Sequence, residues 1–399
     1  MKKQKEYYLN LLRLELCAIV IGLSAGVLDT IFGKGLLRVS QMRDAYPYLT
    51  IPFLGIAGLL ITFLYRRLGG DSQKGMGLVF DVGHGHRQTI PKRLIPLVVL
   101  STWLTHLFGG SAGREGVAVQ LGATLATRFS HFKSVKQNTK ELVVIGIAAG
   151  FAGLFQTPMA ATFFALELLV VGIFSLDILF PAFTAAFLAS QTSHFLGLEK
   201  FSHPLSTSLP LDAQIVGKLM LVGICFAVIG KLFSVALLYL KAKIGNLNQN
   251  PYLKIALGGL ALSLVLLLLH QGRYSGLGTN LIEASFEGQT IYPYDWLLKL
   301  TLTIVTIALG FQGGEVTPLF AIGASFGVVC APVLGLPVPL VAAVGYVSVF
   351  AGATNTLLGP LLIMGEVFGF QTLPYAFVAL TMTSLFHRLP SIYQQQKYL

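Results

Sequence analysis

Apolar segments recur from one end of the chain to the other, and they limit its fold more than any other feature. Several are shorter than the roughly 20 residues with which a helix crosses about 30 Å of hydrocarbon. With 43 Gly and 17 Pro among 399 residues, this shortness predicts broken and tilted helices packed in a thick bundle. The segments are residues 16–32, 51–65, 94–108, 142–154, 163–179, 215–240, 255–269, 297–309, 340–350, 357–368 and 375–385.

The composition supports the same fold class, an all-α multi-pass membrane protein. Hydrophobic residues make up 54% of the chain, and its mean hydropathy of +0.73 lies above that of soluble domains. The net charge of +11 comes in short clusters such as YRRLGG and PKRL, which membrane topology explains better than nucleic acid. Lysines at positions 2, 3 and 5 predict a cytoplasmic N-terminus. Cys17, Cys225 and Cys330 lie apart in apolar segments, so we expect neither a disulfide nor a metal site.

Two segments of the chain repeat each other at a separation of 199 residues. GIAAGFAGLFQTPMAATFFALEL begins at Gly146, and GYVSVFAGATNTLLGPLLIMGEV begins at Gly345. They share the first glycine, a Phe-Ala-Gly triplet, an amide residue followed by Thr, and a final Glu. A second pair, GREGVAVQLGA from Gly113 and GEVTPLFAIGA from Gly314, agrees at a separation of 201 residues.

The agreement of these two blocks predicts two homologous halves. We expect them to meet in the polar linker at residues 196–212 and assign residues 1–205 to the first half and 206–399 to the second. Duplicated halves in a membrane protein are typical of transporters, whose site lies where broken helices present their N-termini. Unpaired N–H groups and the positive end of the helix dipole favour an anion there. Gly75-Met76-Gly77, 113–116 and 313–317 are the candidate helix starts.

The order of these motifs is similar to that of the CLC family of anion channels and anion/proton antiporters. GREG, flanked by GGSAG and VQLGA, is the most specific part of a resemblance that covers nearly the whole chain. The resemblance implies repeats that are inverted in the membrane, a homodimer with one pathway in each subunit, and a location in the cell membrane, the inner membrane of a bacterium. Because the chain ends soon after Tyr393, we expect no cytoplasmic regulatory domain.

Departures from the chloride-transporting pattern imply a narrower branch. Met76 replaces a typical serine, Val117 a typical proline, and GGEVTP places Glu315 and Thr317 where apolar residues are usual. Met76, Glu315 and Thr317 together resemble the fluoride/proton antiporter branch. The second, internal glutamate of chloride/proton exchangers is missing, and Leu168 stands at its position.

Glu115 is the principal candidate for function. Its residue type alone allows a structural role, paired with Arg114 and the helix dipole. A charge in the membrane interior costs roughly 2.5–3.5 kcal/mol, so an acid there usually has a function. An ionised Glu115 can occupy an anion site and a protonated one can leave it, which makes it a gate that exchanges protons. Glu315 and Thr317 are candidates for the proton route, although Thr317 could instead cap the helix that Pro318 begins.

The remaining candidates surround the anion. Met76 is either packing or an apolar wall without the hydroxyl that serves chloride. The resemblance places a tyrosine of the last helix beside the anion, and both Tyr393 and Tyr398 could be that residue. Asn355 could line the path or, like Gln156, hold helix ends together. The full anion-binding set is Gly75, Met76, Gly77, Gly113, Arg114, Gly116, Val117, Val316, Tyr393 and Asn355.

The resulting prediction is a fluoride/proton antiporter that exports fluoride in exchange for protons. It needs no metal or cofactor, and its partners are fluoride, protons, lipid and a second copy of the chain. A chloride or nitrate transporter or channel is the alternative within the family. Outside it, GGSAG fits the nucleophile elbow of a hydrolase, with Ser111 as nucleophile, but lacks the strand-turn-helix context. A channel-like regulatory scaffold is a third alternative.

Overall fold

The computed structural model describes residues 2–132, 134–172, 174, 176–206, 209–247 and 250–398. Helices make up most of the described chain, and one short parallel pair of strands, β1 (Val170–Val171) and β2 (Lys397–Tyr398), joins its middle to its end. The α-helices are α1 (Lys2–Ala45), α2 (Pro47–Thr50), α3 (Leu54–Leu64), α4 (Met76–Gly83), α5 (Leu94–Leu107), α6 (Glu115–Ala126), α7 (Thr139–Phe155), α8 (Pro158–Leu168), α9 (Leu179–Phe195), α10 (Ala213–Gly245), α11 (Pro251–Leu268), α12 (Thr279–Phe286), α13 (Asp295–Leu309), α14 (Val316–Leu334), α15 (Val338–Thr354), α16 (Leu358–Phe368) and α17 (Leu373–Thr383). Short connecting turns lie at Ile51–Phe53, Tyr65–Gly69, Gly70–Lys74, Phe129–His131, Lys136–Asn138, Leu176–Ile178, His270–Gly272, Phe370–Thr372 and Ser384–Phe386.

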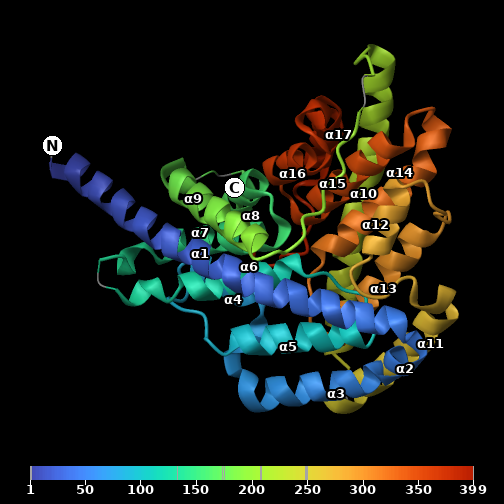
Figure 1. Cartoon of the computed structure of the whole chain (residues 1–399), viewed down its shortest axis with the longest axis horizontal. Coiled ribbons are helices and arrows are strands. Elements are labelled where there is room, and N and C mark those ends of the chain that lie inside the picture. The colour runs from blue at the N-terminus through green and yellow to red at the C-terminus, as the bar shows by residue number, and fades with distance from the viewer. Residues whose placement is uncertain are drawn as a thin grey trace.

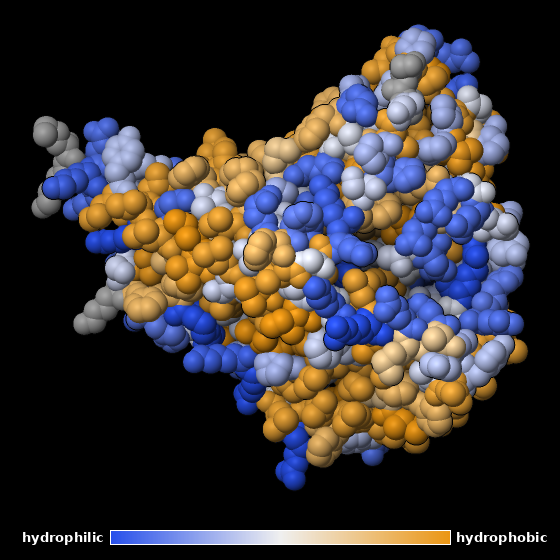
Figure 2. All heavy atoms as spheres, in the orientation of Figure 1, coloured by the Kyte–Doolittle hydropathy of each residue, from blue (hydrophilic) through white to orange (hydrophobic). Residues whose placement is uncertain are grey.

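Broad parts of the outer surface of the bundle are apolar (Figure 2), as a membrane protein requires. Six helical segments of the described chain are long and apolar enough to span a membrane, among them Gln4–Ala45, Ala213–Gly245 and Pro251–Leu268. In Figure 2, hydrophobic side chains cover broad areas of the face over α1 and α3, and hydrophilic side chains gather between them and the opposite rim. The predicted multi-pass helical fold is confirmed.

The sequence repeat is also a repeat of structure. The pairs α4/α12, α7/α15 and α8/α16 have equal lengths of 8, 17 and 11 residues. The first half, blue to green in Figure 1, lies beside the second half, yellow to red. The segment between α9 and α10 contains no helix among its described residues, and the boundary at residues 205 and 206, which falls within it, stays a prediction.

Two glutamates show that equivalent helices run in opposite directions. Glu167, near the end of α8, accepts hydrogen bonds at 2.9 and 2.6 Å from the backbone N–H groups of Leu357 and Leu358, where α16 begins. Glu366, near the end of α16, accepts from the N–H groups at the start of α8 at 3.2 and 2.8 Å. Each helix therefore caps the other, which requires them to be antiparallel. This is the inverted repeat that the family resemblance implies.

Glycines let the helices that carry the site pack closely in both halves. A Cβ atom added to Gly122 would lie 2.1 Å from the carbonyl oxygen of Gly146, where α6 crosses α7. The equivalent contact, between Gly323 of α14 and Gly345 of α15, would be 2.0 Å. No side chain fits at either crossing. Gly122 and Gly146 thus allow α6 to pack closely against α7, and Gly323 and Gly345 allow α14 to pack closely against α15.

The amides of the repeated Gln-Thr and Asn-Thr pairs hold helix ends, as one of the two interpretations predicted. Gln156 and Asn355 both end their helices with left-handed backbone, at φ of 56°. The Gln156 amide donates to the carbonyl oxygen of Leu198 at 2.6 Å. Asn355 donates to two backbone carbonyls at 3.1 Å and accepts from the Lys231 ammonium.

Candidate anion and proton site

The starts of α6 and α14 meet inside the bundle. Gly113 and Gly314, which precede these helices, donate their backbone N–H groups to each other's carbonyl oxygens at 2.5 and 2.8 Å. This double hydrogen bond aligns the two helix starts side by side, although about 200 residues separate them in the sequence. Two sets of unpaired N–H groups and two positive dipole ends therefore share one place.

The Glu115 carboxylate lies across this junction. Its side chain is 1% exposed, and its Oε2 atom accepts from the backbone N–H of Thr317 at 3.1 Å and from the Thr317 hydroxyl at 2.5 Å. The backbone N–H of Arg114 is a third donor, at 3.3 Å. A carboxylate thus occupies donors that α14 would otherwise present to an anion.

Thr317 does not cap its helix, contrary to one of the two sequence interpretations. The residue at the N-cap of α14 is Glu315, and its side chain makes no capping hydrogen bond. Thr317 is the second residue of α14, and its hydroxyl donates a hydrogen bond to Glu115 of the first half. The Thr-Pro pair is compatible with capping in sequence, but the helix begins two residues before Pro318.

The pairing of Arg114 with Glu115 is weak in geometry. The Arg114 Nε atom lies 3.7 Å from Glu115 Oε1, and that oxygen accepts no hydrogen bond. The guanidinium is 13% exposed, and its Nε and Nη1 atoms are buried without partners. Arg114 therefore supplies a nearby positive charge without holding the carboxylate in place. One Glu115 oxygen is fully bonded and the other is not.

A cavity of about 300 Å³, which we call the Met76 cavity, adjoins this junction. Its walls come from the three predicted helix starts, from the end of α10 and from the C-terminal segment. Six of the predicted site residues line it: Gly75, Met76, Gly77, Gly116, Glu315 and Tyr393. Gly113, Arg114, Val117, Val316 and Thr317 lie in the helix starts behind this lining. The structure thus brings together all the predicted site residues except Asn355.

Glu315 lies between the first turn of α6 and Lys241 of α10. Its Oε1 atom lies 3.8 Å from the Lys241 ammonium of α10, which is 38% exposed and lines the cavity. Its Oε2 atom faces Gly116, 3.8 Å from where a Cβ atom would stand. One oxygen of the Glu315 carboxylate therefore faces the first turn of α6, and the other faces a lysine that is partly exposed.

Tyr393 is the tyrosine at the site. It is 6% exposed, lines the Met76 cavity and packs against the Phe80 ring at 5.5 Å between centroids. The Tyr398 side chain lies elsewhere, with its hydroxyl accepting from Asn355 at 3.0 Å. The expectation that this tyrosine belongs to the last helix was wrong. It lies in the non-helical segment beyond α17. Gln396 of the same segment donates a hydrogen bond from its side-chain amide to the backbone carbonyl of Leu168 in α8.

Asn355 lies apart from the other candidates. Its oxygen and its nitrogen are engaged by Lys231, by backbone carbonyls and by Tyr398, and it is absent from the lining of the Met76 cavity. These contacts hold the end of α15 against the C-terminal segment. A side chain with its polar atoms so engaged has no free donor to offer an anion.

Gln120 and Lys241 are among the residues of the Met76 cavity that sequence reasoning missed. Gln120 is 7% exposed, its Oε1 atom has no partner, and it faces Gly75 across the cavity. A glutamine one turn after Gly116, within an otherwise apolar helix, is a signal that could have been used. Lys241 gave no such signal, because a lysine at the end of a long apolar helix is usual at a membrane surface.

Ser111 anchors the loop before α6. Its hydroxyl is fully buried, accepts from the Lys299 ammonium at 2.9 Å and lies 2.8 Å from the Thr303 hydroxyl. Its backbone N–H donates to the Thr306 hydroxyl at 3.2 Å. The loop follows the helix α5 rather than a strand, so the surroundings of a nucleophile elbow are absent from this described segment.

Known proteins resemble this chain in sequence and fold. A family model described as "Voltage gated chloride channel" matches residues 57–388. The chain belongs to this family. The predicted family resemblance is thereby confirmed.

Relatives of the family resemble the whole chain. A "Chloride/fluoride channel protein" of Pseudomonas syringae pv. tomato is 35% identical over 385 residues, which cover 95% of this chain and 85% of the relative. A solved structure described as a CLC-type fluoride/proton antiporter is 54% identical, with a TM-score of 0.96 and 98% of each chain covered. A slow cyanobacterial chloride/proton antiporter, at 20% identity and a TM-score of 0.80 over 94% of each chain, shares the fold.

Proposed function

We propose that this protein is a fluoride/proton antiporter that exports fluoride in exchange for protons. One observation carries the proposal: the Glu115 carboxylate is bound by Thr317 donors at the junction of two helix starts, next to the Met76 cavity. A carboxylate at that place binds as an anion does and can also accept a proton. The names of a relative and of a solved structure that include fluoride support the choice of ion.

The exchange follows from the charge of Glu115. Ionised, it occupies the N–H and O–H donors of Thr317 and excludes a second anion from them by repulsion and by hydrogen bonding. Protonated, it is neutral, so it binds these donors less strongly and leaves them to fluoride. Fluoride and the carboxylate thus alternate at one set of donors, and each departure of the carboxylate takes a proton with it.

Glu315 and Lys241 supply the proton route to the cytoplasmic side. Glu315 borders the first turn of α6 on one side and faces the Lys241 ammonium on the other. Burial favours the neutral, protonated form of Glu315, and the nearby ammonium stabilises the ionised form, so the side chain can take up a proton and release it into the Met76 cavity. In this proposal Glu315 takes the place of the internal glutamate that Leu168 replaces.

Selectivity for fluoride depends on the hydrogen-bond donors that line the Met76 cavity and on how closely they can approach the ion. Fluoride is small and strongly hydrated, so its water shell must be replaced by close N–H and O–H donors. Gly75 and Gly77 allow close approach of the backbone, whereas the Met76 thioether offers no hydroxyl. Chloride and nitrate accept a looser cage, and a cavity with a serine at this position would serve them better.

Ion efflux from liposomes tests the proposal. Purified protein is reconstituted in liposomes loaded with fluoride or with chloride, and efflux is followed by ion-selective electrodes while pH is recorded outside. We expect fluoride efflux to exceed chloride efflux and to drive protons inward against a pH gradient. Chloride efflux equal to or faster than fluoride efflux would instead support the chloride or nitrate alternative.

The family resemblance also leads us to propose a homodimer with one pathway in each subunit, in the inner membrane of a bacterium. Crosslinking in native membranes, followed by denaturing electrophoresis, tests this assembly. A band at twice the mass of the 43.0 kDa chain is expected. Failure to obtain that band with several crosslinkers of different length would count against the dimer.

We propose no hydrolytic role for Ser111. Its hydroxyl is buried and bonded to Lys299 and Thr303, which leaves it unavailable to a substrate. Purified protein should therefore release no product from ester or peptide substrates.

A further inference from the structure

A groove of about 290 Å³, which we call the Arg66 groove, lies between the end of α3, the start of α11 and the end of α13. Ile61, Ile255 and Leu309 form its apolar part. Arg66, just after the end of α3, and Lys254, in the first turn of α11, add two cations to its lining. The mechanism proposed above assigns this groove no role.

The surface on both sides of the Arg66 groove is apolar. Leu60 and Phe63 of α3 are exposed, and so are Leu253 and Leu257 of α11. The helix α11 is long and apolar enough to span a membrane. Exposed leucine and phenylalanine side chains on such a helix meet the acyl chains of the bilayer. The groove therefore opens toward lipid.

The two cations of the Arg66 groove lie on the cytoplasmic side. The lysines near the N-terminus place the start of α1 in the cytoplasm. Figure 1 shows the chain turning at α2, so that α3 runs back toward the face from which α1 starts. Arg66 follows the end of α3 and therefore lies near the cytoplasmic boundary of the membrane, where lipid phosphates are found.

No acid compensates these two cations within the described chain. None of the residues that line the Arg66 groove is an Asp or a Glu, and neither Arg66 nor Lys254 takes part in an ion pair there. The Arg66 guanidinium lies over the Tyr252 ring, 5.4 Å from its centroid. The Lys254 ammonium donates to the backbone carbonyl of Ile244 at 2.7 Å. Both cations therefore keep N–H donors for a further ligand.

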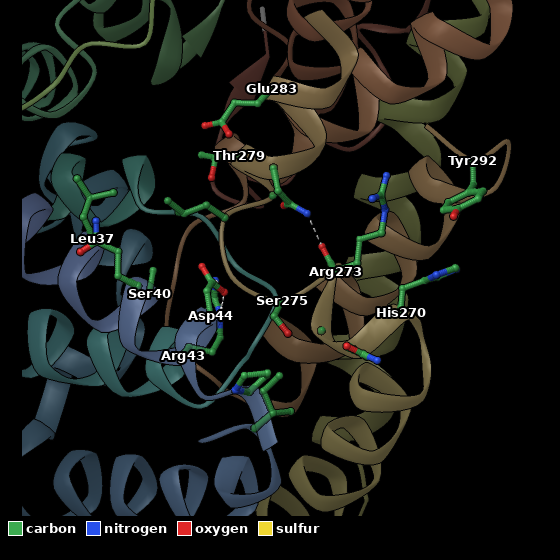
Figure 3. Close-up of a pocket in the computed structure, with 18 residues that line it drawn as sticks. Leu37, Ser40, Arg43, Asp44, His270, Arg273, Ser275, Thr279, Glu283 and Tyr292 are labelled. Carbon is green, nitrogen blue, oxygen red and sulfur yellow. Dashed lines mark hydrogen bonds and ion pairs between the residues drawn. The ribbon is translucent and has the colours of Figure 1, made fainter. Parts of the chain in front are cut away.

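The cavity drawn in Figure 3 provides a contrast. It has a volume of about 710 Å³ and lies between the end of α1, residues 270–278 and α12. Acids line it together with its cations, since Arg43 pairs with Asp44 at 2.7 Å and Glu283 also contributes to the lining. The Arg66 groove has cations of the same kind without these counter-charges. An anionic group is therefore the complement that the groove lacks.

One wall separates the Arg66 groove from the Met76 cavity. Gln73, Gly310 and Gln312 line both of them. Tyr65, which lines the groove, donates from its hydroxyl to Gln312 at 3.3 Å and accepts from the Gln73 amide at its backbone carbonyl at 3.2 Å. A ligand in the groove would therefore contact one side of a wall whose other side faces the Met76 cavity.

We propose that the Arg66 groove binds one anionic phospholipid of the cytoplasmic leaflet. The lipid phosphate bonds to Arg66 and Lys254, and part of an acyl chain lies along Ile61 and Ile255. A soluble phosphate ester would satisfy the cations and leave the apolar part of the groove empty, so the ligand is a lipid. The inference goes beyond the proposed fluoride transport and does not depend on it.

Mass spectrometry of the intact protein under non-denaturing conditions tests this site. Purified protein in detergent is titrated with phosphatidylglycerol or with phosphatidylcholine of the same acyl chains, and bound lipids are counted. Wild-type protein should bind the first phosphatidylglycerol more tightly than phosphatidylcholine. Arg66→Gln and Lys254→Gln should each raise the dissociation constant for phosphatidylglycerol roughly fivefold, the effect of one cation near an anionic headgroup, and leave phosphatidylcholine unchanged.

Lys243→Gln is the matched control. This exposed lysine near the end of α10 also lies over a tyrosine ring, 5.9 Å from the centroid of Tyr239, but does not line the Arg66 groove. Its loss should change neither dissociation constant. Thr62→Trp places a ring in the groove without changing the charge and should weaken binding of phosphatidylglycerol. Glycerol phosphate, the soluble headgroup alone, should not displace the lipid.

The opposite outcomes would overturn the site. Equal binding of the two lipids by wild-type protein would remove the role of the cations. An equal loss of affinity in Lys243→Gln and Arg66→Gln would mean that lipid is attracted by the overall positive surface and not by the groove. Displacement by glycerol phosphate would assign the cations to a soluble ligand. Because no fluoride is present in these titrations, each of these results leaves the proposed transport untouched.

Discussion

The starts of α6 and α14 have the same backbone arrangement and different chemistry. Both follow glycines that bond to each other through their backbones. After this glycine, the first half continues with Arg-Glu-Gly and the second with Glu-Val-Thr. The first half therefore provides the acid that changes charge, Glu115, and the second provides the donors that bind it, at Thr317.

The two halves therefore share a backbone scaffold that the repeat provides. The residues that differ between the halves, Glu115 in one and Thr317 in the other, provide the exchange of carboxylate and anion. A symmetric pair of helix starts would present two equal sets of donors and no group able to exchange with an anion. Placing the acid in one half and its donors in the other makes binding of the carboxylate reversible. The predictions below separate the shared scaffold from the chemistry that differs.

The shared scaffold is tested at the glycine crossings, where the largest effect is expected. Gly122→Val and Gly323→Val each force a side chain into a backbone oxygen at about 2 Å. Both variants should yield no monodisperse protein in size-exclusion chromatography after detergent extraction. Gly217→Val, at a position with nothing within 4 Å, should behave as wild type. Normal folding of only one crossing variant would show that the halves do not share one packing scheme.

The first chemical difference to remove is the acid at the start of α14. Glu315→Gln keeps the shape of the side chain but cannot release a proton toward Lys241. Fluoride-driven proton movement in liposomes should fall by about 100-fold, as for loss of a proton-transferring group. Glu287→Gln, at an exposed acid, is the control. Uphill proton movement at near the wild-type rate in Glu315→Gln would mean that water or Glu115 alone carries the proton.

The second difference is at Met76. At the repeat separation of 201 residues, the equivalent position in the second half is Leu277, which also lies between two glycines. Met76→Ser adds a hydroxyl donor to the Met76 cavity, and the ratio of chloride to fluoride flux should rise by roughly tenfold, the value of one hydrogen bond to an anion. Met220→Ser, at an exposed position of α10, controls for the loss of a methionine. An unchanged ratio would assign Met76 to packing and place selectivity elsewhere.

The smallest change is at Thr317. Thr317→Val removes the hydroxyl donor to Glu115 but keeps the backbone donor at 3.1 Å. Fluoride exchange should slow by about three- to tenfold, with coupling retained in part. Thr317→Ser keeps both donors and should restore the rate. If valine and serine behave alike in transport measurements, the hydroxyl is not used.

The pairing of the two helix starts could be predicted from the sequence because both starts belong to the internal repeat. Matching glycines at one separation indicated that the starts of α6 and α14 are equivalent, and an acid beside one of them indicated its function. The position of Lys241 next to Glu315 could not be predicted, since no repeat or motif tells which side chain a distant helix brings near.

Asn355 shows the opposite case. Its amide and its place in the repeat were visible in the sequence, and they favoured a role in holding helix ends while leaving a place in the anion path open. Only the tertiary contacts decide, because the partners of its amide are backbone carbonyls and a lysine from distant parts of the chain. The role of Tyr393 likewise depended on how the non-helical C-terminal segment packs against Phe80.

The central claim is that one carboxylate, Glu115, exchanges with fluoride and carries the proton. The most direct test is the proton movement that a fluoride gradient drives in liposomes, compared between wild type and Glu115→Gln. We predict that wild-type protein moves protons uphill and that Glu115→Gln moves none, whether or not it still conducts fluoride. Unchanged proton uptake in Glu115→Gln liposomes would contradict the account.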